Sequence, residues 1–318
     1  MATTRYKNAP YFLDAFKPAR GMTTGYPELK GFLNAVLDCD TLKDVADVFE
    51  SFATKLAARG AENKRGTWRY FLERQAKVYR AGNIPGDVFK KGNGKLPFVT
   101  FSTLPDVTCP GAGACLSFCY SFKAFRYPAA LLRQLANTLR LRFAKRSIIE
   151  AFRKIRATNR KGKRTTVRLY VDGDFDSVET AVFWFGLIRQ RPELIVYGYS
   201  KSWEILETVE RLVPENYVLN LSSGSKYADD GELAERLAGR SFVRGFYVAV
   251  KTEHDHGTEG MGRYATKAYH DDVRQSMVRE GYGKGFSCVG PCGQCRVSAG
   301  LPACADKLFN VTIGNGVH

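Results

Sequence analysis

The sequence predicts an α/β protein with a partial or irregular (β/α) barrel-like parallel sheet, preceded by an α-helical region and followed by a cysteine-rich tail. Three observations predict this fold: apolar residues at helical spacing before residue 95, apolar runs alternating with helical stretches over residues 96–250, and cysteines gathered beyond residue 285. We therefore expect a basic α-helical N-terminal region (1–95), a β/α core (96–250) and a metal-binding C-terminal segment (251–318).

In the N-terminal region, apolar residues recur at helical spacing over residues 28–58 and 66–81, which predicts two helices. In the core, apolar runs predict five strands: Leu96–Ser102, Val167–Val171, Leu194–Tyr199, Tyr217–Leu221 and Phe242–Val250. The stretches between them read as helices: Tyr127–Thr158, Ser177–Gln190, Ser202–Val213 and Asp229–Ala238. Strands that alternate with helices imply a mainly parallel sheet with right-handed crossovers.

Polar residues follow the predicted strands, and in parallel α/β folds the chemistry lies at these strand ends. Asp172 and Asp174 follow the second strand, and Lys201 follows the third. We predict these three as catalytic residues. Asp176 with Glu179 resembles a capping box, so we interpret Asp176 as a helix cap.

Seven of the eight cysteines fall in two groups. The first is Cys109, Cys115 and Cys119, and the second is Cys288, Cys292, Cys295 and Cys304. Glycine and proline between these thiols let the backbone wrap closely around a bulky ligand. Clustered cysteines in a reducing compartment point to metal, so we predict all seven as metal ligands.

The metal is predicted to be an iron–sulfur cluster of the [4Fe–4S] type, with zinc as the alternative. The C-x₅-C-x₃-C spacing of the first group differs from that of a zinc knuckle. The second group opens with C-x₃-C-x₂-C, the spacing of a radical-SAM motif, but Gln294 stands where those motifs prefer an aromatic residue. The sequence leaves open whether one cluster uses both groups or two clusters form.

The net charge of +16 is concentrated in two stretches. From Lys123 to Arg168 there are fifteen Lys and Arg residues against one acid, which favours a polyanionic partner such as nucleic acid. We expect sequence-independent phosphate contacts. The predicted contact residues are Arg133, Arg140, Lys145, Arg146, Arg153, Arg160, Lys161, Lys163 and Arg164.

No apolar run is long enough for a transmembrane helix, and the N-terminus lacks a signal-peptide pattern. We therefore expect no membrane partner and a location in the cytoplasm, that of the host cell if a phage encodes the chain.

Several short motifs occur in a characteristic order: Thr108-Cys-Pro-Gly-Ala with Cys115 and Cys119-Tyr120, Asp172-Gly-Asp-Phe, Tyr199-Ser-Lys-Ser-Trp, and the cysteine-rich C-terminus. Over about residues 96–305 this order resembles the phage and plasmid family known as gene product 88. The resemblance implies a mobile-element protein with a cysteine-bound cluster. The chain is also distantly similar to radical-SAM-like barrels.

Three functions follow as hypotheses. The leading one is an iron–sulfur protein of a phage or mobile element that binds nucleic acid through a basic surface. The second is a cluster-containing enzyme, hydrolytic or radical-SAM-like, acting at the strand ends of a TIM-barrel-like scaffold. The third is an interaction protein whose basic face binds an acidic host protein.

Overall fold

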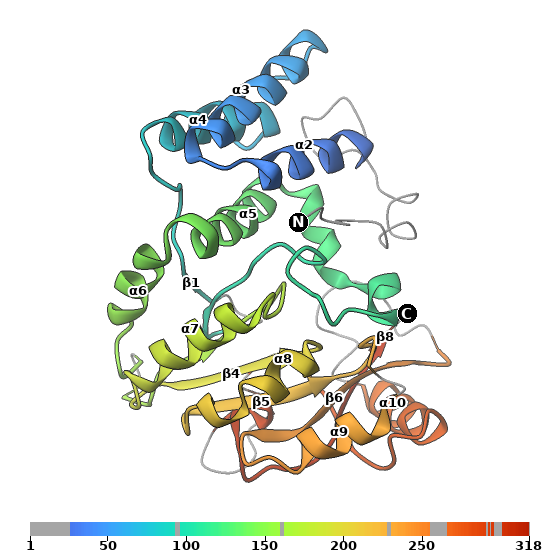
Figure 1. Ribbon diagram of the computed structural model, residues 1–318. Coiled ribbons are helices and arrows are strands. Elements are labelled where there is room, and N and C mark those ends of the chain that lie inside the picture. The colour runs from blue at the N-terminus through green and yellow to red at the C-terminus, as the bar shows by residue number, and fades with distance from the viewer. Residues whose placement is uncertain are drawn as a thin grey trace. The chain divides into compact units, whose positions relative to one another are not determined.

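The computed structural model describes residues 26–92, 96–159, 162–227, 230–254, 266–290, 292, 294–295 and 301–317 (Figure 1). They form two compact units. The helical unit comprises the described residues up to Val88, Ser102–Thr108 and Leu116–Phe152. The sheet unit comprises Phe89–Phe101, Cys109–Cys115 and the described residues from Arg153 onward. This grouping differs from the predicted one, because residues 116–152 join the N-terminal helices and the C-terminal segment joins the core.

The helical unit contains α2 (Tyr26–Asp38), α3 (Leu42–Ala58), α4 (Trp68–Arg80), the 3₁₀ helix η2 (Tyr120–Arg126), α5 (Pro128–Phe143) and α6 (Lys145–Arg153). The single helix predicted over residues 28–58 is two helices, because Thr41 caps α3. Its hydroxyl accepts from the Asp44 N–H, and the Asp44 carboxylate accepts from the Thr41 N–H at 3.0 Å. This reciprocal pair is a capping box, which starts a new helix.

The long helix predicted over Tyr127–Thr158 also divides, into α5 and α6. Ala144 ends α5 with φ −148° and ψ 47°, outside the helical region. Its N–H still bonds to the Arg140 carbonyl, and Ser147 bonds back to the Ala144 carbonyl at 2.8 Å. The apolar spacing continues across this break, which is why the sequence reads as one helix.

The sheet unit is built on eight strands: β1 (Lys90–Lys91), β2 (Val99–Thr100), β3 (Thr166–Arg168), β4 (Ile195–Ser200), β5 (Tyr217–Ser222), β6 (Val243–Lys251), β7 (Phe286–Ser287) and β8 (Ile313–Val317). Their order is β1-β2-β3-β4-β5-β6-β8-β7, and every pair except β1–β2 is parallel. The five predicted strands are β2 to β6, which confirms the mainly parallel α/β core. The sheet is open and not a closed barrel, since β1 and β7 form its two edges.

Four helices pack on one face of this sheet: α7 (Val178–Arg189), α8 (Trp203–Thr208), α9 (Gly231–Ala238) and α10 (Lys267–Arg279). The first three are the crossovers of consecutive parallel strands, and right-handed crossovers place them on the same face. Phe185 of α7 lies against Tyr217 of β5 with ring centroids 5.3 Å apart. On β6, Val248 and Val250 pack against Tyr269, Val273 and Met277 of α10.

The opposite face, which we call the tail face, is covered in part by the C-terminal segment. Side chains alternate along a strand, so Ile195, Tyr197 and Tyr199 of β4 point to this face. Leu301, Cys304 and Ala305 pack against Ile195, Tyr197 and Val218. The fold therefore carries the second cysteine group onto the tail face.

Candidate metal centre and strand-end rim

Two buried polar residues fix the C-terminal segment to the tail face. The Asn220 amide donates to the Gly198 carbonyl at 3.1 Å and to the Cys304 carbonyl at 2.9 Å, while its oxygen accepts from Arg244 Nε at 2.6 Å. Arg244 Nη1 donates to the carbonyls of Phe309 and Val311, both at 2.8 Å. Together they hold the chain on both sides of Cys304 and its neighbours.

The four C-terminal thiols are electrostatic neighbours. Burial is the main cause that raises the pKa of Cys288, to about 12, and the charges of Cys304, Cys292 and Cys295 raise it further. Burial likewise raises the pKa of Cys304 to about 11, with Cys292 and Cys295 again among the contributing charges. The four thiols of the second group thus interact electrostatically, and their role as metal ligands stays a prediction.

Hydrogen-bond donors point at these sulfurs. The Gly290 N–H donates to Cys288 Sγ at 3.4 Å, and the Ala303 N–H donates to Cys295 Sγ at 3.5 Å. Tyr199 hydrogen-bonds to the Cys304 thiol, which lowers its pKa against the larger effect of burial. Donors of this kind stabilise thiolates and tune the potential of a metal cluster bound to them.

Arg244 adds a buried positive charge beside the thiols. Only 1% of its surface is exposed, and among the described residues no carboxylate lies within ion-pair distance of it. Its Nη2 is buried without a hydrogen-bond partner in that part of the chain. Burial lowers the pKa of Arg244, and the ionised forms of Cys304, Tyr199, Asp306 and Cys295 act against this effect, in that order.

The described residues contain no group of three or more His, Cys, Asp or Glu side chains arranged to hold a single metal ion. The seven predicted cysteine ligands therefore form no such group in this part of the chain. Tetrahedral zinc requires four sulfurs each about 2.3 Å from one point. A cluster binds each thiolate to a different iron, so its ligands lie farther apart.

The first cysteine group is divided between the two units. Cys109 and Cys115 belong to the sheet unit, and Cys119 belongs to the helical unit. Cys115 is buried, and burial is the largest cause that raises its pKa. Lys201 has the largest opposing effect. Cys115 of the first group thus interacts with Lys201, which is one of the three predicted catalytic residues and lies in a different loop.

Glycines allow the loop Cys109–Cys115 to lie against the ends of β4 and β5. The N–H groups of Gly113 and Cys115 both donate to the Gly224 carbonyl at 3.1 Å. A Cβ at Gly111 would meet the Lys201 carbonyl at 1.7 Å, and a Cβ at Gly224, where φ is +74°, would meet Cys115 Cβ at 2.9 Å. Only glycine fits these positions, so the glycines serve close backbone packing here.

Asp174 has a structural role at this edge. Its carboxylate accepts from Ser200 Oγ at 2.7 Å, from the Lys201 N–H at 2.7 Å and from the Phe175 N–H at 2.8 Å. Burial raises its pKa, and these three donors act in the opposite direction. Asp174 therefore joins the loop after β3 to the loop after β4.

The other two predicted catalytic residues differ from Asp174. Asp172 is half-buried and makes no hydrogen bond or ion pair among the described residues. Lys201 Nζ donates to Ser222 Oγ at 2.6 Å. Lys201, Ser222 and Cys115 thus meet where β4 and β5 end, and we call this place the strand-end rim. The predicted cap at Asp176 is wrong, because Ser177 is the N-cap of α7 and accepts from the Thr180 N–H at 3.1 Å.

The predicted phosphate contacts occupy very different surroundings. Arg140 is 2% exposed and donates to Asn137 and to the carbonyls of Ile84, Pro85 and Gly86, so it is a structural residue and leaves the predicted set. The side chain of Arg146 is exposed and pairs with Glu150 at 3.0 Å. Arg133 and Lys145 are half-buried in the helical unit. Arg160 and Lys161 lie outside the described residues.

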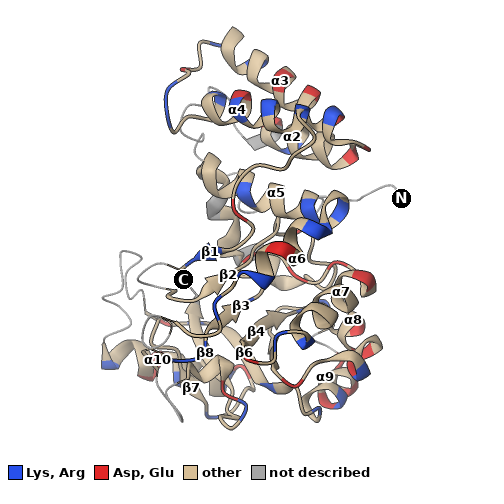
Figure 2. Cartoon of the chain, turned by 90° about the vertical axis from the view of Figure 1, so that its left-hand side faces the viewer, with Lys and Arg blue, Asp and Glu red and all other residues tan. Residues whose placement is uncertain are grey.

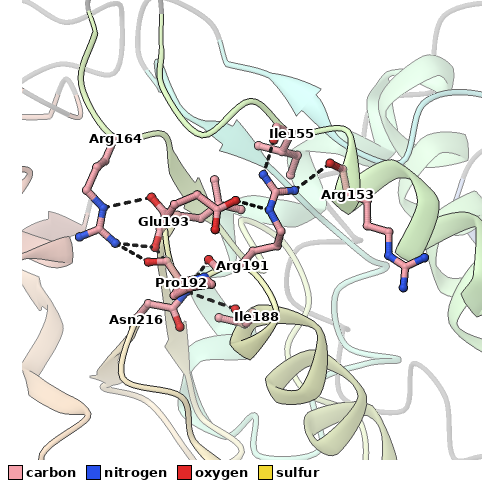
Figure 3. Close-up of polar contacts among 9 residues, drawn as sticks. Arg153, Ile155, Arg164, Ile188, Arg191, Pro192, Glu193 and Asn216 are labelled. Atoms are coloured by element: carbon pink, nitrogen blue, oxygen red, sulfur yellow. Dashed lines mark hydrogen bonds and ion pairs between the residues drawn. The ribbon is translucent and has the colours of Figure 1, made fainter.

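In the sheet unit, two arginines fix the segment that precedes β3 (Figure 3). Arg164 Nη2 donates to the carbonyls of Pro192 at 2.6 Å and Leu194 at 3.2 Å. Arg191 donates to the carbonyls of Arg153 at 2.8 Å and Ile155 at 2.6 Å. Figure 3 shows the Arg153 guanidinium pointing away from this network.

Besides Arg164, whose guanidinium bonds to carbonyls, four basic residues of this segment are exposed among the described residues: Arg153, Lys154, Arg156 and Lys163. We call them the basic platform. Residues 151–164 contain no acid. The predicted contact set contains Arg153 and Lys163 and leaves out Lys154 and Arg156, and phosphate contact by any of these residues stays a prediction. The feature of the sequence that points to Lys154 and Arg156 is the absence of acidic residues from 151–164.

The fold and these sites define a class: a two-unit α/β protein whose open parallel sheet carries a cysteine-bearing segment on one face. The sequence profile of the Gene product 88 family matches residues 72–299, so the chain belongs to that family. No curated protein and no solved structure matches the chain. The likeness to radical-SAM barrels therefore stays a prediction. No helix among the described residues has the length and apolar character needed to cross a membrane.

Proposed function

We propose that this chain is an iron–sulfur protein of a phage or other mobile element, located in the cytoplasm of the host cell. Its cluster would be held on the tail face by the thiols of the second group, Cys288, Cys292, Cys295 and Cys304. A cluster in this place would supply one-electron transfer or a redox-sensitive brace for the C-terminal segment. The first group would contribute through Cys109 and Cys115 only if a cluster also reaches the strand-end rim.

The observation that carries this proposal is the charge of Arg244. A buried cation without a counterion is costly, and a thiolate-bound cluster is anionic. The groups that interact electrostatically with Arg244 include the thiols of Cys304 and Cys295. An anionic cluster would therefore neutralise Arg244, and the N–H groups of Gly290 and Ala303 would donate to its thiolate ligands Cys288 and Cys295.

Cysteine spacing favours iron–sulfur over zinc. The first three thiols of this group are separated by x₃ and then x₂, which is tighter than two separated zinc pairs.

Anaerobic purification with iron, sulfide and zinc analysis tests the proposal. We expect about four irons and four sulfides per chain, with loss of both in Cys292→Ser and Cys304→Ser. Cys39→Ser is the matched control, because Cys39 is buried in the helical unit and its thiol donates to the Ala35 carbonyl at 3.2 Å. Zinc without iron, or full iron in both variants, would overturn the assignment. Iron loss in Cys115→Ser as well would place the first group in the same centre.

A second candidate activity is nucleic-acid binding through the basic platform. Figure 2 shows that Lys and Arg also line α5 and α6, but Arg140 of α5 is buried and Arg146 of α6 is paired with an acid. The side chains of the basic platform are exposed and are not paired with an acid among the described residues. The contacts of Arg164 and Arg191 hold the backbone of the platform in place. Preorganised cations of this kind suit phosphate contacts that do not depend on sequence.

The salt dependence of binding tests this candidate. A triple variant, Lys154→Gln with Arg156→Gln and Lys163→Gln, should reduce the slope of log affinity against log salt for duplex DNA by roughly 2 to 3, since each phosphate contact contributes about 0.9. The control changes three exposed lysines elsewhere in the same unit, Lys226, Lys267 and Lys284, with the same loss of charge. An equal reduction of the slope in both triple variants would show that net charge, and not the basic platform, determines DNA binding. Binding of an acidic host protein that survives high salt would support the interaction-protein hypothesis instead.

A further inference from the structure

Lys201 is a half-buried cation at the strand-end rim that has no ion pair among the described residues. Its single side-chain hydrogen bond goes to Ser222 Oγ, and Ser222 is 6% exposed. An ammonium group has three N–H donors, so two of them have no protein acceptor among the described residues. Charged groups that are withdrawn from water without a partner are rare outside functional sites.

No ion pair balances the charge of Lys201 among the described residues. The Asp174 carboxylate interacts with Lys201 electrostatically, but its oxygens accept hydrogen bonds from Ser200, Phe175 and the Lys201 backbone, and not from the ammonium. The ammonium therefore keeps N–H donors that no side chain in this part of the chain accepts.

The place of Lys201 in the fold is one where ligands bind. It directly follows β4, and it contacts the last residue of β5. Open parallel sheets bind ligands outside the carboxyl ends of their strands. The alternation of β4 continues from Tyr197 and Tyr199 to Lys201, which directs Lys201 toward the tail face.

Hydrogen bonds fix the backbone next to Lys201. The Ser225 hydroxyl donates to the carbonyls of Gly111 and Lys201, both at 3.0 Å, and the Lys226 N–H donates to the Gly111 carbonyl at 2.9 Å. These bonds fix the backbone of Lys201 between the cysteine loop and the end of β5. The ammonium is thus held by a rigid frame, which lowers the entropy lost on binding a ligand.

We propose that Lys201 and Ser222 form a binding site for a small oxyanion, the carboxylate or phosphate group of a small-molecule ligand. The two remaining ammonium donors and the Ser222 hydroxyl would bind its oxygens, with the Cys115 thiol at its side. Two oxygens and a negative charge satisfy this set of donors, whereas a neutral ligand leaves the charge of Lys201 unbalanced. The site does not depend on the presence of the cluster.

Thermal unfolding with added inorganic phosphate tests the site. Phosphate should raise the Tm of the wild-type chain beyond sodium chloride of equal ionic strength, and Lys201→Gln should remove most of this difference. Lys226→Gln is the matched control, because Lys226 is an exposed lysine in the neighbouring loop. Comparing the variants in the same phosphate buffer cancels its general stabilising effect on proteins. Acetate in a parallel series separates carboxylate from phosphate recognition.

A second measurement needs no variant and tests the site even if Lys201→Gln does not fold. In the wild-type chain, bound phosphate should slow reductive methylation of Lys201 at least severalfold, while methylation of Lys226 proceeds at an unchanged rate. Equal Tm shifts in Lys201→Gln and Lys226→Gln, or equal methylation of Lys201 with and without both anions, would overturn the site. Neither result affects the iron content, so failure of this site and failure of the cluster are distinguishable.

Discussion

Arg140 shows how the surroundings of one residue change the meaning of its charge. In the sequence it is one of several arginines on a basic helix, but in the fold it is a buried hub for three consecutive carbonyls of the chain before β1. Its pKa is lowered by burial, so its charge is tolerated only because these acceptors surround it. Its role is to attach α5 to the segment that follows α4.

Arg140→Met should therefore destabilise the chain by about 2–4 kcal/mol, because several buried carbonyls lose their donor. Urea unfolding measures this change. Arg146→Met, which removes an exposed i,i+4 ion pair, should have a much smaller effect. If Arg140→Met kept its stability but lost affinity for nucleic acid, the structural role of Arg140 would be refuted.

Gly224 is a second residue whose role depends on its contacts. Gly224→Ala should destabilise the chain by about 2 kcal/mol or more, because φ is +74° and the new methyl group meets Cys115. Gly186→Ala is the control. Gly186 lies within α7 with nothing near the added Cβ, so alanine there should stabilise by about 0.5–1 kcal/mol. The urea midpoints of both variants decide the matter, and a harmless Gly224→Ala would contradict the tight loop packing.

At the scale of elements, the C-terminal segment depends on Asn220 and Arg244. Asn220→Ala should loosen the segment 301–311, since it removes the bond to the Cys304 carbonyl and the acceptor of Arg244. Limited proteolysis should then cut this segment faster, and the iron content should fall. Asn216→Ala is the control, because Asn216 bonds to carbonyls of Ile188, Arg191 and Leu194. Equal protease sensitivity of the two variants would show that Asn220 does not anchor the segment.

The elements also show what the sequence can and cannot predict. Strands β2 to β6 were predictable, because apolar runs separated by amphipathic stretches have a direct physical cause. Strand β8 was not, because Ile-Gly-Asn-Gly-Val reads as a turn. Its glycines are required by packing, since a Cβ at Gly314 would meet Met277 Sδ at 2.2 Å. That requirement comes from α10, which is distant in the sequence.

The candidate site was predictable to a similar degree. Cysteine spacing identified the second group, and the position after β4 identified Lys201. Asn220 and Arg244 were missed, because each lies within an apolar run and carries no motif. Their roles depend on which strand neighbours which and on which face the tail covers. The structural role of Asp174 was missed for the same reason: its partners come from a different loop.

At the scale of the whole molecule, the two units should respond differently to loss of the cluster. Trp68 reports on the helical unit, while Trp184 and Trp203 report on the sheet unit. In Trp68→Phe, the tryptophan fluorescence reports on the sheet unit alone. Adding Cys292→Ser to this variant should lower its fluorescence unfolding midpoint by several degrees, because a ligand that binds only the folded unit stabilises it. The double variant Trp184→Phe with Trp203→Phe, which retains Trp68, should show no such shift. Identical shifts in both would mean that the units unfold together.

The order of the strands has a consequence for how the chain reaches its native state. Strand β8 lies between β6 and β7 in the sheet. In the sequence, all four thiols of the second group lie between β7 and β8. A chain whose thiol-bearing segment is not yet docked leaves β6, nine residues long, with an unpaired side. Such an open edge is a template for pairing with another molecule. In the proposed iron–sulfur protein, docking of the thiol-bearing segment would therefore both complete the metal centre and cover this edge of β6.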